Sequence, residues 1–213
     1  ARTENPVTPR RVPMSGTKRF ARNRKSNVRN ANIAFFLPVT DQVIFDHLKG
    51  RQTLDENRNT LIFDDLLKAL DEGRSPLLLT ERTAHVEYFA NRLKGFAKKV
   101  IVLRGGMGNK QRQQVADKLL SIPEGEERVL IATGRFIGEG FDDPRLDPLF
   151  LVIPISWKGT LQQYAGRLHR LHSNKRVVRI YDYVDPHIPV LKRMYEKRLQ
   201  GYRDMGYQTE TKG

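Results

Sequence analysis

Residues 77–103 alternate between two hydrophobic patterns. Two short apolar runs, Leu77-Leu-Leu79 and Val100-Ile-Val-Leu103, flank a stretch from Thr83 to Lys94 whose apolar residues recur at helical spacing, namely Val86, Phe89, Ala90 and Leu93. A short apolar run predicts a strand buried on both faces, and apolar residues three and four apart predict a helix with one buried face. These residues therefore predict a strand–helix–strand unit.

The alternation continues toward the C-terminus. We predict helices over 57–72, 109–120, 160–171 and 188 to about 202, and strands over 128–132, 149–153 and 177–184. Strands separated by helices indicate a parallel sheet with helices on both faces, so the predicted fold class is α/β. Ligands of such sheets bind outside the carboxyl ends of the strands. The candidate functional loops therefore begin at Thr80, Arg104, Thr133 and Pro154.

The composition limits the possible functions. The chain has 213 residues, a formal net charge of +14 and no cysteine, which excludes disulfides, thiolate metal sites and a cysteine nucleophile. The positive charge favours a polyanionic partner, and nucleic acid is the first candidate. The sequence has no run of about 18 apolar residues of the kind that spans a membrane. The lack of cysteine fits a reducing compartment, and we expect a cytoplasmic location.

The first part of the chain differs in character from the rest. Residues 1–30 carry nine Lys or Arg and a single Glu. We therefore divide the chain into residues 1–56, a basic arm or linker with a short helix over 40–48, and residues 57–213, the α/β domain. The chain starts at Ala1 without a methionine, and we expect it to be a fragment of a larger protein.

The predicted helix over 160–171 contains Gln163-Tyr-Ala-Gly-Arg167-Leu-His-Arg170. Gln163, Arg167 and Arg170 stand at i, i+4 and i+7 and share one face, while apolar residues repeat this spacing on another face. Because arginine stays charged and grips phosphate oxygens with a rigid fork, this face predicts a phosphate-rich target.

Other interpretations of these residues stay open. Gln163 also fits a capping box with Thr160, and the two arginines also fit an ordinary solvated face. Gly166 favours a functional interpretation, because glycine inside a helix costs about 1 kcal/mol relative to alanine unless packing or a close approach requires it. We expect no metal site, since His169 and His172 lack partners at metal-ligand spacing.

Two glycine-rich segments follow predicted strands. Thr133 to Asp142 contains three glycines that allow close approach of a ligand to the backbone, and Asp142 can accept a hydrogen bond from a ribose hydroxyl. Arg104 to Lys110 opens a helix, whose first N–H groups suit one phosphate. Each segment also fits a turn without a ligand. Thr80, at the end of a predicted strand, fits either a phosphate contact or a structural role.

The order of these segments is more specific than any one of them. Gln163-x-x-Gly-Arg167-x-x-Arg170 resembles motif VI of the superfamily-two helicases, Ala132-Thr133 through Asp142 resembles their motif V, and Leu77-Leu-Leu-Thr80 resembles motif IV. The resemblance covers about residues 57–185 and implies the C-terminal RecA-like domain. In some details, the amino-acid sequence is more similar to bacterial DEAD/DEAH-type DNA helicases and restriction-system proteins than to DEAD-box RNA helicases.

The sequence departs from the family pattern in four places, one of which is Asn109, where the family usually has a glutamine. Tyr164 stands where motif VI commonly has an arginine, and His169 stands where it commonly has a glycine. The segment that resembles motif V is one residue longer than the commonest version. Both arginines of motif VI are present, so their assignment is unaffected.

The resemblance implies that ATP with Mg²⁺ lies between two RecA-like domains and is bound mainly by the first, which this chain lacks. Arg167 and Arg170 would be the arginine fingers, with Gln163 beside them, and Gly140 and Asp142 would contact the ATP. Residues that would line a groove for nucleic acid, with DNA favoured over RNA, are Thr80, Arg82, Gly105, Gly106 and Thr133.

The family's phosphate-binding loop and acidic box do not occur in this sequence. We therefore expect the chain alone neither to hydrolyse ATP nor to unwind DNA, and we expect the first RecA-like domain of the same polypeptide to be its partner. Two alternatives remain. One is a nucleic-acid-binding module without motor activity, and the other is half of a nucleotide-sugar transferase that binds a diphosphate through Gly138 and Gly140.

Overall fold

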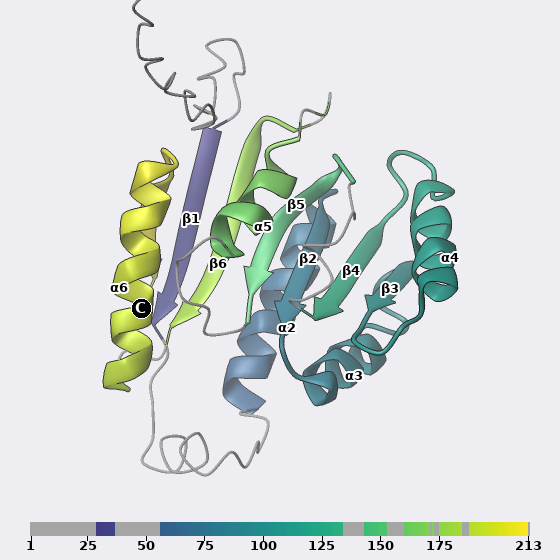
Figure 1. The fold of residues 1–213 in the computed structure, drawn as a ribbon, viewed down its shortest axis with the longest axis horizontal. Helices are drawn as coiled ribbons and strands as arrows, with labels where there is room; N and C mark the ends of the chain where they lie inside the picture. Colours follow the sequence, from purple (N-terminus) through teal and green to yellow (C-terminus); the bar gives the residue numbers. More distant parts are fainter. Residues whose placement is uncertain are drawn as a thin grey trace, which may run out of the picture.

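The computed structural model describes residues 29–36, 56–133, 143–152, 160–170, 172, 175–184 and 188–212. Its centre is a seven-stranded parallel sheet with the strand order β3-β4-β2-β5-β6-β1-β7 (Figure 1). The strands are β1 (Arg29–Phe36), β2 (Ser75–Thr80), β3 (Lys99–Leu103), β4 (Arg128–Thr133), β5 (Leu146–Leu151), β6 (Val177–Val184) and β7 (Gln208–Lys212). The predicted α/β fold with a parallel sheet is confirmed.

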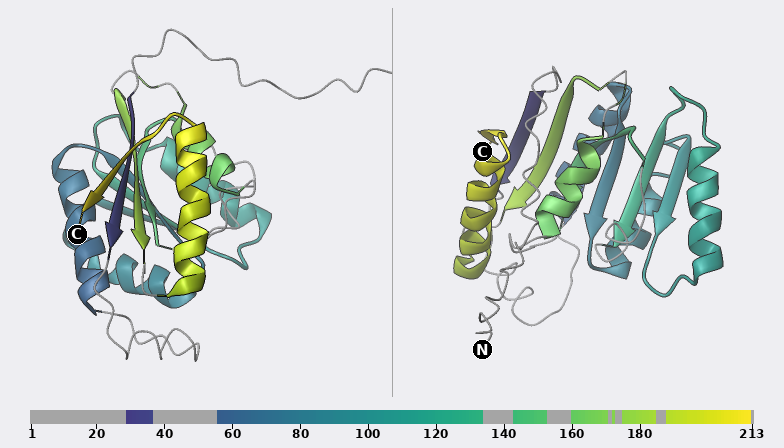
Figure 2. Two further views of the ribbon diagram at one scale, coloured as in Figure 1. Left: turned by 90° about the vertical axis from the view of Figure 1, so that its left-hand side faces the viewer. Right: turned by 45° about the horizontal axis from the view of Figure 1, so that its top comes forward.

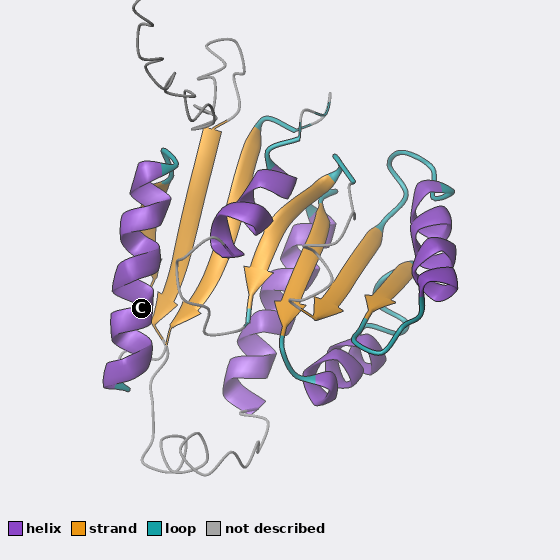
Figure 3. Cartoon of the chain, viewed as in Figure 1, coloured by secondary structure: helices purple, strands orange, loops and turns teal. Residues whose placement is uncertain are grey.

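Helices cover both faces of the sheet (Figures 2 and 3). One core lies between the sheet and the helices α4, α5 and α6, and a second core lies between the opposite face and the helices α2 and α3. The helices are α2 (Glu56–Asp71), α3 (Thr83–Arg92), α4 (Asn109–Leu120), α5 (Thr160–Leu168) and α6 (Pro189–Asp204). This layering explains why the central strands are apolar on both sides.

Strand β5 begins three residues before the predicted strand over 149–153. Its first residues include Asp147, which is buried and binds Arg74. The Asp147 carboxylate also accepts a hydrogen bond from the backbone N–H of Arg179, at 2.9 Å. Because Asp147 is charged, the first residues of β5 are not part of an apolar run. The apolar pattern therefore predicts only the later part of the strand.

Strands β1 and β7 extend the sheet beyond the predicted alternation. β1 pairs in parallel with β6, from Arg29 with Val177 to Phe36 with Val184, and on its other side it pairs in parallel with β7. Residues 29–36, which the sequence analysis placed in the basic arm, are therefore part of the sheet. The division at residue 57 stays a prediction, and the short helix predicted over 40–48 lies outside the described residues.

The strand order reverses at β2. The chain leaves β2 for β3 and β4 on one side and continues to β5 and β6 on the other. Ligands of open α/β sheets bind at such a switch point, beyond the carboxyl ends of the strands. The strands labelled in Figure 1 point downward, so this edge is at the bottom of that view.

Candidate functional site

Helix α5 has one buried and one exposed face, as the sequence predicts. The residues of the buried face are at most 4% exposed and belong to the core that α5 shares with the sheet. These residues are Leu161, Tyr164, Ala165 and Leu168. On the other face Gln163 is exposed, and Arg167 is partly exposed. The buried face fixes the helix on the sheet, so the exposed side chains have a stable base.

The helix ends at Leu168, three residues before the predicted end. The N–H of His169 still donates to the carbonyl of Ala165 at 3.1 Å. The carbonyl of Leu168 instead accepts a hydrogen bond from Nζ of Lys175 at 2.8 Å. Exposed Arg170 therefore lies just past the helix and not on a continuous helical face with Arg167.

Histidine 169 is held by the C-terminal part of the chain. Its Nε2 lies 2.9 Å from the hydroxyl of Tyr207, between α6 and β7. Burial and then the charge of Lys175 lower the pKa of His169. An imidazole bonded to the hydroxyl of a buried tyrosine has a structural role in the turn after α5.

Among the described residues, nothing packs against Gly166. A Cβ built at this position would meet none of their atoms within 4 Å, and the residue is exposed. This open space favours the close approach of a partner as the reason for a glycine inside the helix. Gln163 lies in the first half of the helix, but residues 153–159 before it are outside the described part of the chain. Its capping-box interpretation accordingly stays open.

Threonine 80 is fully buried at the end of β2. Its hydroxyl accepts a hydrogen bond from the backbone N–H of Arg82 at 3.3 Å and lies 3.3 Å from Nδ1 of His85. Burial, followed by the charges of Arg58 and Arg82, lowers the pKa of His85 to about 4. The hydroxyl of Thr80 is thus used inside the protein, and its contact with nucleic acid stays a prediction.

Threonine 133 lies beside Thr80, since their Cα positions pair between β4 and β2. Its hydroxyl is buried and has no hydrogen-bond partner within the described residues. The loop that follows, with Gly140 and Asp142, lies outside them. The predicted ATP contacts of this loop therefore stay predictions.

Gly105 and Gly106 form an exposed loop after β3. Gly106 has a φ of 84°, which favours glycine. The loop borders a cavity of about 580 Å³ whose lining includes Arg104, Gln111 and Lys118. The N–H of Gly108 donates to Oε1 of Gln111 at 3.2 Å, which stabilises the start of α4. This loop thus combines exposed backbone with positively charged side chains. Arg82 is partly exposed at the start of α3.

The predicted site residues fall into two groups. Thr80, Thr133 and the Gly105–Gly106 loop lie at the carboxyl edge of the sheet. The end of α5 lies toward the opposite edge, because the carbonyl of Leu168 binds Lys175, just before β6 begins. Arg167 in the last turn of α5 and Arg170 just past it therefore lie away from the carboxyl edge. The rule that ligands lie beyond the carboxyl ends therefore covers the first group only.

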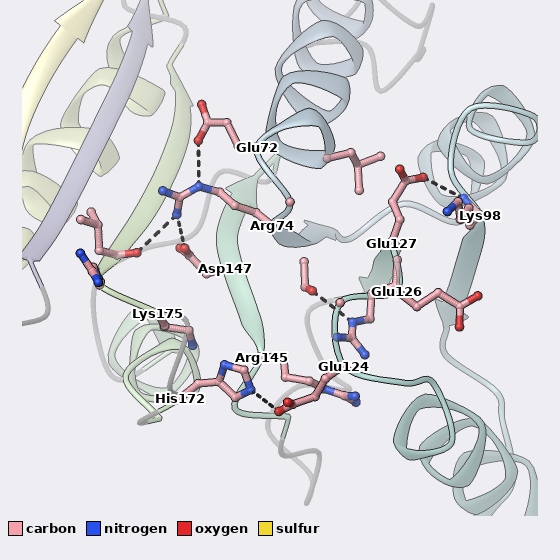
Figure 4. Close-up of a pocket in the computed structure, with 17 residues that line it drawn as sticks. Glu72, Arg74, Lys98, Glu124, Glu126, Glu127, Arg145, Asp147, His172 and Lys175 are labelled. Carbon is pink, nitrogen blue, oxygen red and sulfur yellow. Dashed lines mark hydrogen bonds and ion pairs between the residues drawn. The ribbon is translucent and has the colours of Figure 1, made fainter.

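A second cavity, which the sequence analysis missed, lies at the amino ends of the strands (Figure 4). Its volume is about 490 Å³. Arg74 forms an ion pair with Asp147 in its wall, and Nε2 of His172 lies 2.9 Å from Oε1 of Glu124. Burial raises the pKa of Asp147, although its contacts with Arg179 and Arg74 oppose this. Its lining comes from separate segments of the chain, so no local motif identifies it.

The described residues contain no group of three His, Asp, Glu or Cys side chains that could hold a metal ion. Arg167 on α5 and Arg170 just past it carry guanidinium groups, which bind phosphate oxygens. The described part of the chain also contains no helix long and apolar enough to cross a membrane.

A comparison with known protein families shows the family to which the chain belongs. The sequence profile of the helicase conserved C-terminal domain matches residues 56–172. The chain belongs to this family. It carries a helicase conserved C-terminal domain, as its motifs implied, and α5 lies within the matched residues.

Curated relatives come from poxviruses. The chain is 29% identical over 120 residues to transcript termination protein A18 of vaccinia virus strain Ankara, which is 55% of this chain and 24% of that protein. It is 30% identical over 121 residues to transcript termination protein OPG145 of monkeypox virus, with the same coverage. The chain thus spans about a quarter of the length of the curated relatives it matches.

Solved structures share the fold. T4 UvsW matches with a TM-score of 0.64 at 17% identity, over 87% of this chain and 42% of that one. The C-terminal part of the Fun30 ATPase domain matches with a TM-score of 0.55 at 18% identity, over 70% of this chain and 49% of that one. At these identities the similarity shows the RecA-like fold of helicase C-terminal domains and not a shared substrate.

Proposed function

We propose that this chain is the C-terminal motor domain of an ATP-dependent nucleic-acid helicase or translocase. In this proposal Arg167 and Arg170 are arginine fingers for an ATP held, with Mg²⁺, mainly by a first RecA-like domain. The observation that carries the proposal is the form of α5. Its buried face is fixed on the sheet, Gly166 and Arg167 lie on its outer face, and exposed Arg170 follows just past its end.

Charge on the transferred phosphoryl group explains the need for arginine. Bound ATP supplies that group, and negative charge spreads over its oxygens in the transition state. A guanidinium group delivered from a second domain stabilises this charge and is worth about 10³–10⁵ in rate. Because Arg167 is partly exposed and Arg170 exposed, a neighbouring domain can reach both.

The carboxyl edge supports the second half of the proposal, which is a groove for a nucleic-acid strand, with DNA favoured over RNA. Gly105 and Gly106 expose backbone next to Arg104 and Lys118 around one cavity. Backbone N–H groups and cations bind phosphates without reading the base sequence, as a translocating motor requires. Membership of the helicase family argues against the nucleotide-sugar transferase.

The test uses the complete protein that contains both motor domains. We expect Arg167→Ala and Arg170→Ala each to lower kcat for nucleic-acid-stimulated ATP hydrolysis, on the order of 10³-fold, while strand binding persists. Lys68→Ala serves as the control, because Lys68 is an exposed cation of α2 on the opposite face of the sheet. Unchanged hydrolysis in both arginine variants would overturn the proposal and favour a binding module without motor activity.

A further inference from the structure

Lysine 175 lies in the connection between α5 and β6 and is 9% exposed. Its Nζ donates to the carbonyl of Leu168 at 2.8 Å and approaches the carbonyl of Arg170 at 3.5 Å. Figure 4 shows it at the wall of the cavity at the amino edge. One ammonium group thus reaches both the last residue of α5 and the arginine that follows it.

This lysine is buried without a carboxylate at ion-pair distance among the described residues. A buried charge is costly unless its surroundings compensate for it. Here the compensation is the end of a helix, where carbonyl groups lack partners and the helix dipole is negative. The ammonium group therefore both depends on the end of α5 and fixes it.

A second contact holds the same turn from the other side. His169 bonds to Tyr207, and Tyr207 packs edge-on against Tyr202. The hydroxyl of Tyr202 donates to Asp182 at 2.9 Å, inside a buried pair with Arg198. This side of the turn is therefore rigid, and Lys175 is the contact that reaches toward Arg170.

We propose that Lys175 is a positioning residue, whose ammonium group fixes the last turn of α5 and thereby the direction of Arg167 and Arg170. This inference rests on the proposed function, in which those arginines act on ATP. A displacement of about 1 Å at a reacting centre can cost about 10²-fold in rate. Losing the Lys175 contact should therefore lower catalysis without removing a group that touches ATP.

The protonation of Lys175 offers an independent readout. Burial lowers the pKa of this lysine to about 8, and the charges of Asp147 and Asp143 act in the opposite direction. Other charged or titratable groups lie around the same cavity or in the same connection, namely Glu72, Arg74, Lys98, Glu124, Glu126, Glu127, Arg128, Arg145, His169, Arg170, His172 and Arg176. Above about pH 8 the lysine loses the charge that favours the helix end, and its hold on α5 weakens.

The experiment compares Lys175→Met, Lys175→Arg and Arg176→Met in the complete protein. At pH 7 we expect Lys175→Met to lower kcat for ATP hydrolysis about tenfold to hundredfold, with the KM for ATP changed less than about twofold. Lys175→Arg should recover most of the rate, since a guanidinium group can bind the same carbonyls. Arg176→Met removes an exposed neighbouring charge and should change neither constant.

Raising the pH separates positioning from simple folding. The wild-type kcat should decline above about pH 8, and Lys175→Arg should abolish this decline because arginine stays protonated. Amide hydrogen exchange of residues 166–170 should accelerate in Lys175→Met. If Lys175→Met does not fold, the pH profile of Lys175→Arg still decides, and a decline as in the wild type overturns the inference.

The two proposals fail in different ways. If both arginine variants keep full hydrolysis, the proposed function is wrong, whereas amide exchange still reports whether Lys175 holds α5. If the arginine variants lose activity but folded Lys175→Met keeps the wild-type kcat and the wild-type exchange rates, only the inference about Lys175 is overturned.

Discussion

Gly166 is a single residue whose substitution bears directly on the proposed function. It is exposed within α5, and space around it is open within the described residues. A glycine that is needed by its own fold and one that is needed by a partner respond differently to substitution, because only the first loses stability when a methyl group is added.

We therefore predict opposite effects of Gly166→Ala on stability and activity. The free energy of unfolding of this chain should rise by about 0.5–1 kcal/mol, because alanine restricts the unfolded state and favours helix. ATP hydrolysis by the complete protein should fall about tenfold or more, since the added methyl group displaces the approaching domain. Urea unfolding and steady-state kinetics measure the two quantities. Gain of stability with unchanged hydrolysis would contradict a close approach at this position.

At the scale of elements, α6 is tied to β6 by a buried ion pair. Arg198 donates from Nε and Nη2 to the two carboxylate oxygens of Asp182, at 2.8 and 2.9 Å, and both side chains are at most 3% exposed. The charge of Asp182 raises the pKa of Arg198 against the effect of burial. The pair thus fixes the element that carries Tyr202 and, beyond it, Tyr207.

We predict that Arg198→Met lowers the free energy of unfolding by about 3–5 kcal/mol, because it leaves the Asp182 carboxylate buried without its cation. Lys197→Met, at an exposed neighbouring position of α6, should change it by less than about 0.5 kcal/mol. Removing both charges in Arg198→Met with Asp182→Leu should restore part of the loss. Equal unfolding midpoints for the Arg198 and Lys197 variants would show that the pair contributes nothing.

Helix α5 shows what the sequence could predict at this scale. Its two faces followed from the spacing of Tyr164 and Leu168 against Gln163 and Arg167, because helical periodicity is a local property. Leu171, which was predicted on the same buried face, lies outside the described residues. The end of α5 did not follow, because the cation that binds the carbonyl of Leu168 comes from Lys175, beyond the helix. Contacts of this kind depend on tertiary structure and leave no local pattern.

At the scale of the whole molecule, features with a local sequence pattern were again predicted, and features that depend on tertiary contacts were not. Buried central strands were predicted because β2 and β5 are covered on both faces. The edge strand β7 was missed because Gln208-Thr-Glu-Thr-Lys212 is polar, and β1 was assigned to the arm because its neighbours in the sequence are strongly basic. Strand order was not predictable either, since pairing between distant strands is not encoded in any one segment.

At the same scale we predict salt-dependent binding of single-stranded nucleic acid by the isolated chain. The slope of log Kd against log salt concentration should fall by about 0.7 for Arg104→Ala and again for Lys118→Ala, one phosphate contact each. Lys68→Ala, on the opposite face, should leave the slope unchanged. Fluorescence titrations at several salt concentrations measure it. Slopes that do not differ among the three variants would place the strand elsewhere on the molecule.

The position of β1 between β6 and β7 has a consequence for folding. The last strand of the chain pairs with β1, so β7 can join the sheet only after a segment from near the start of the chain has closed a loop of well over a hundred residues onto β6. Closing such a loop is slow, and until it happens β6 presents an open edge of unpaired N–H and C=O groups. Residues 29–36 therefore protect the growing sheet from pairing with other chains, and a fragment cut after residue 36 would expose an aggregation-prone edge.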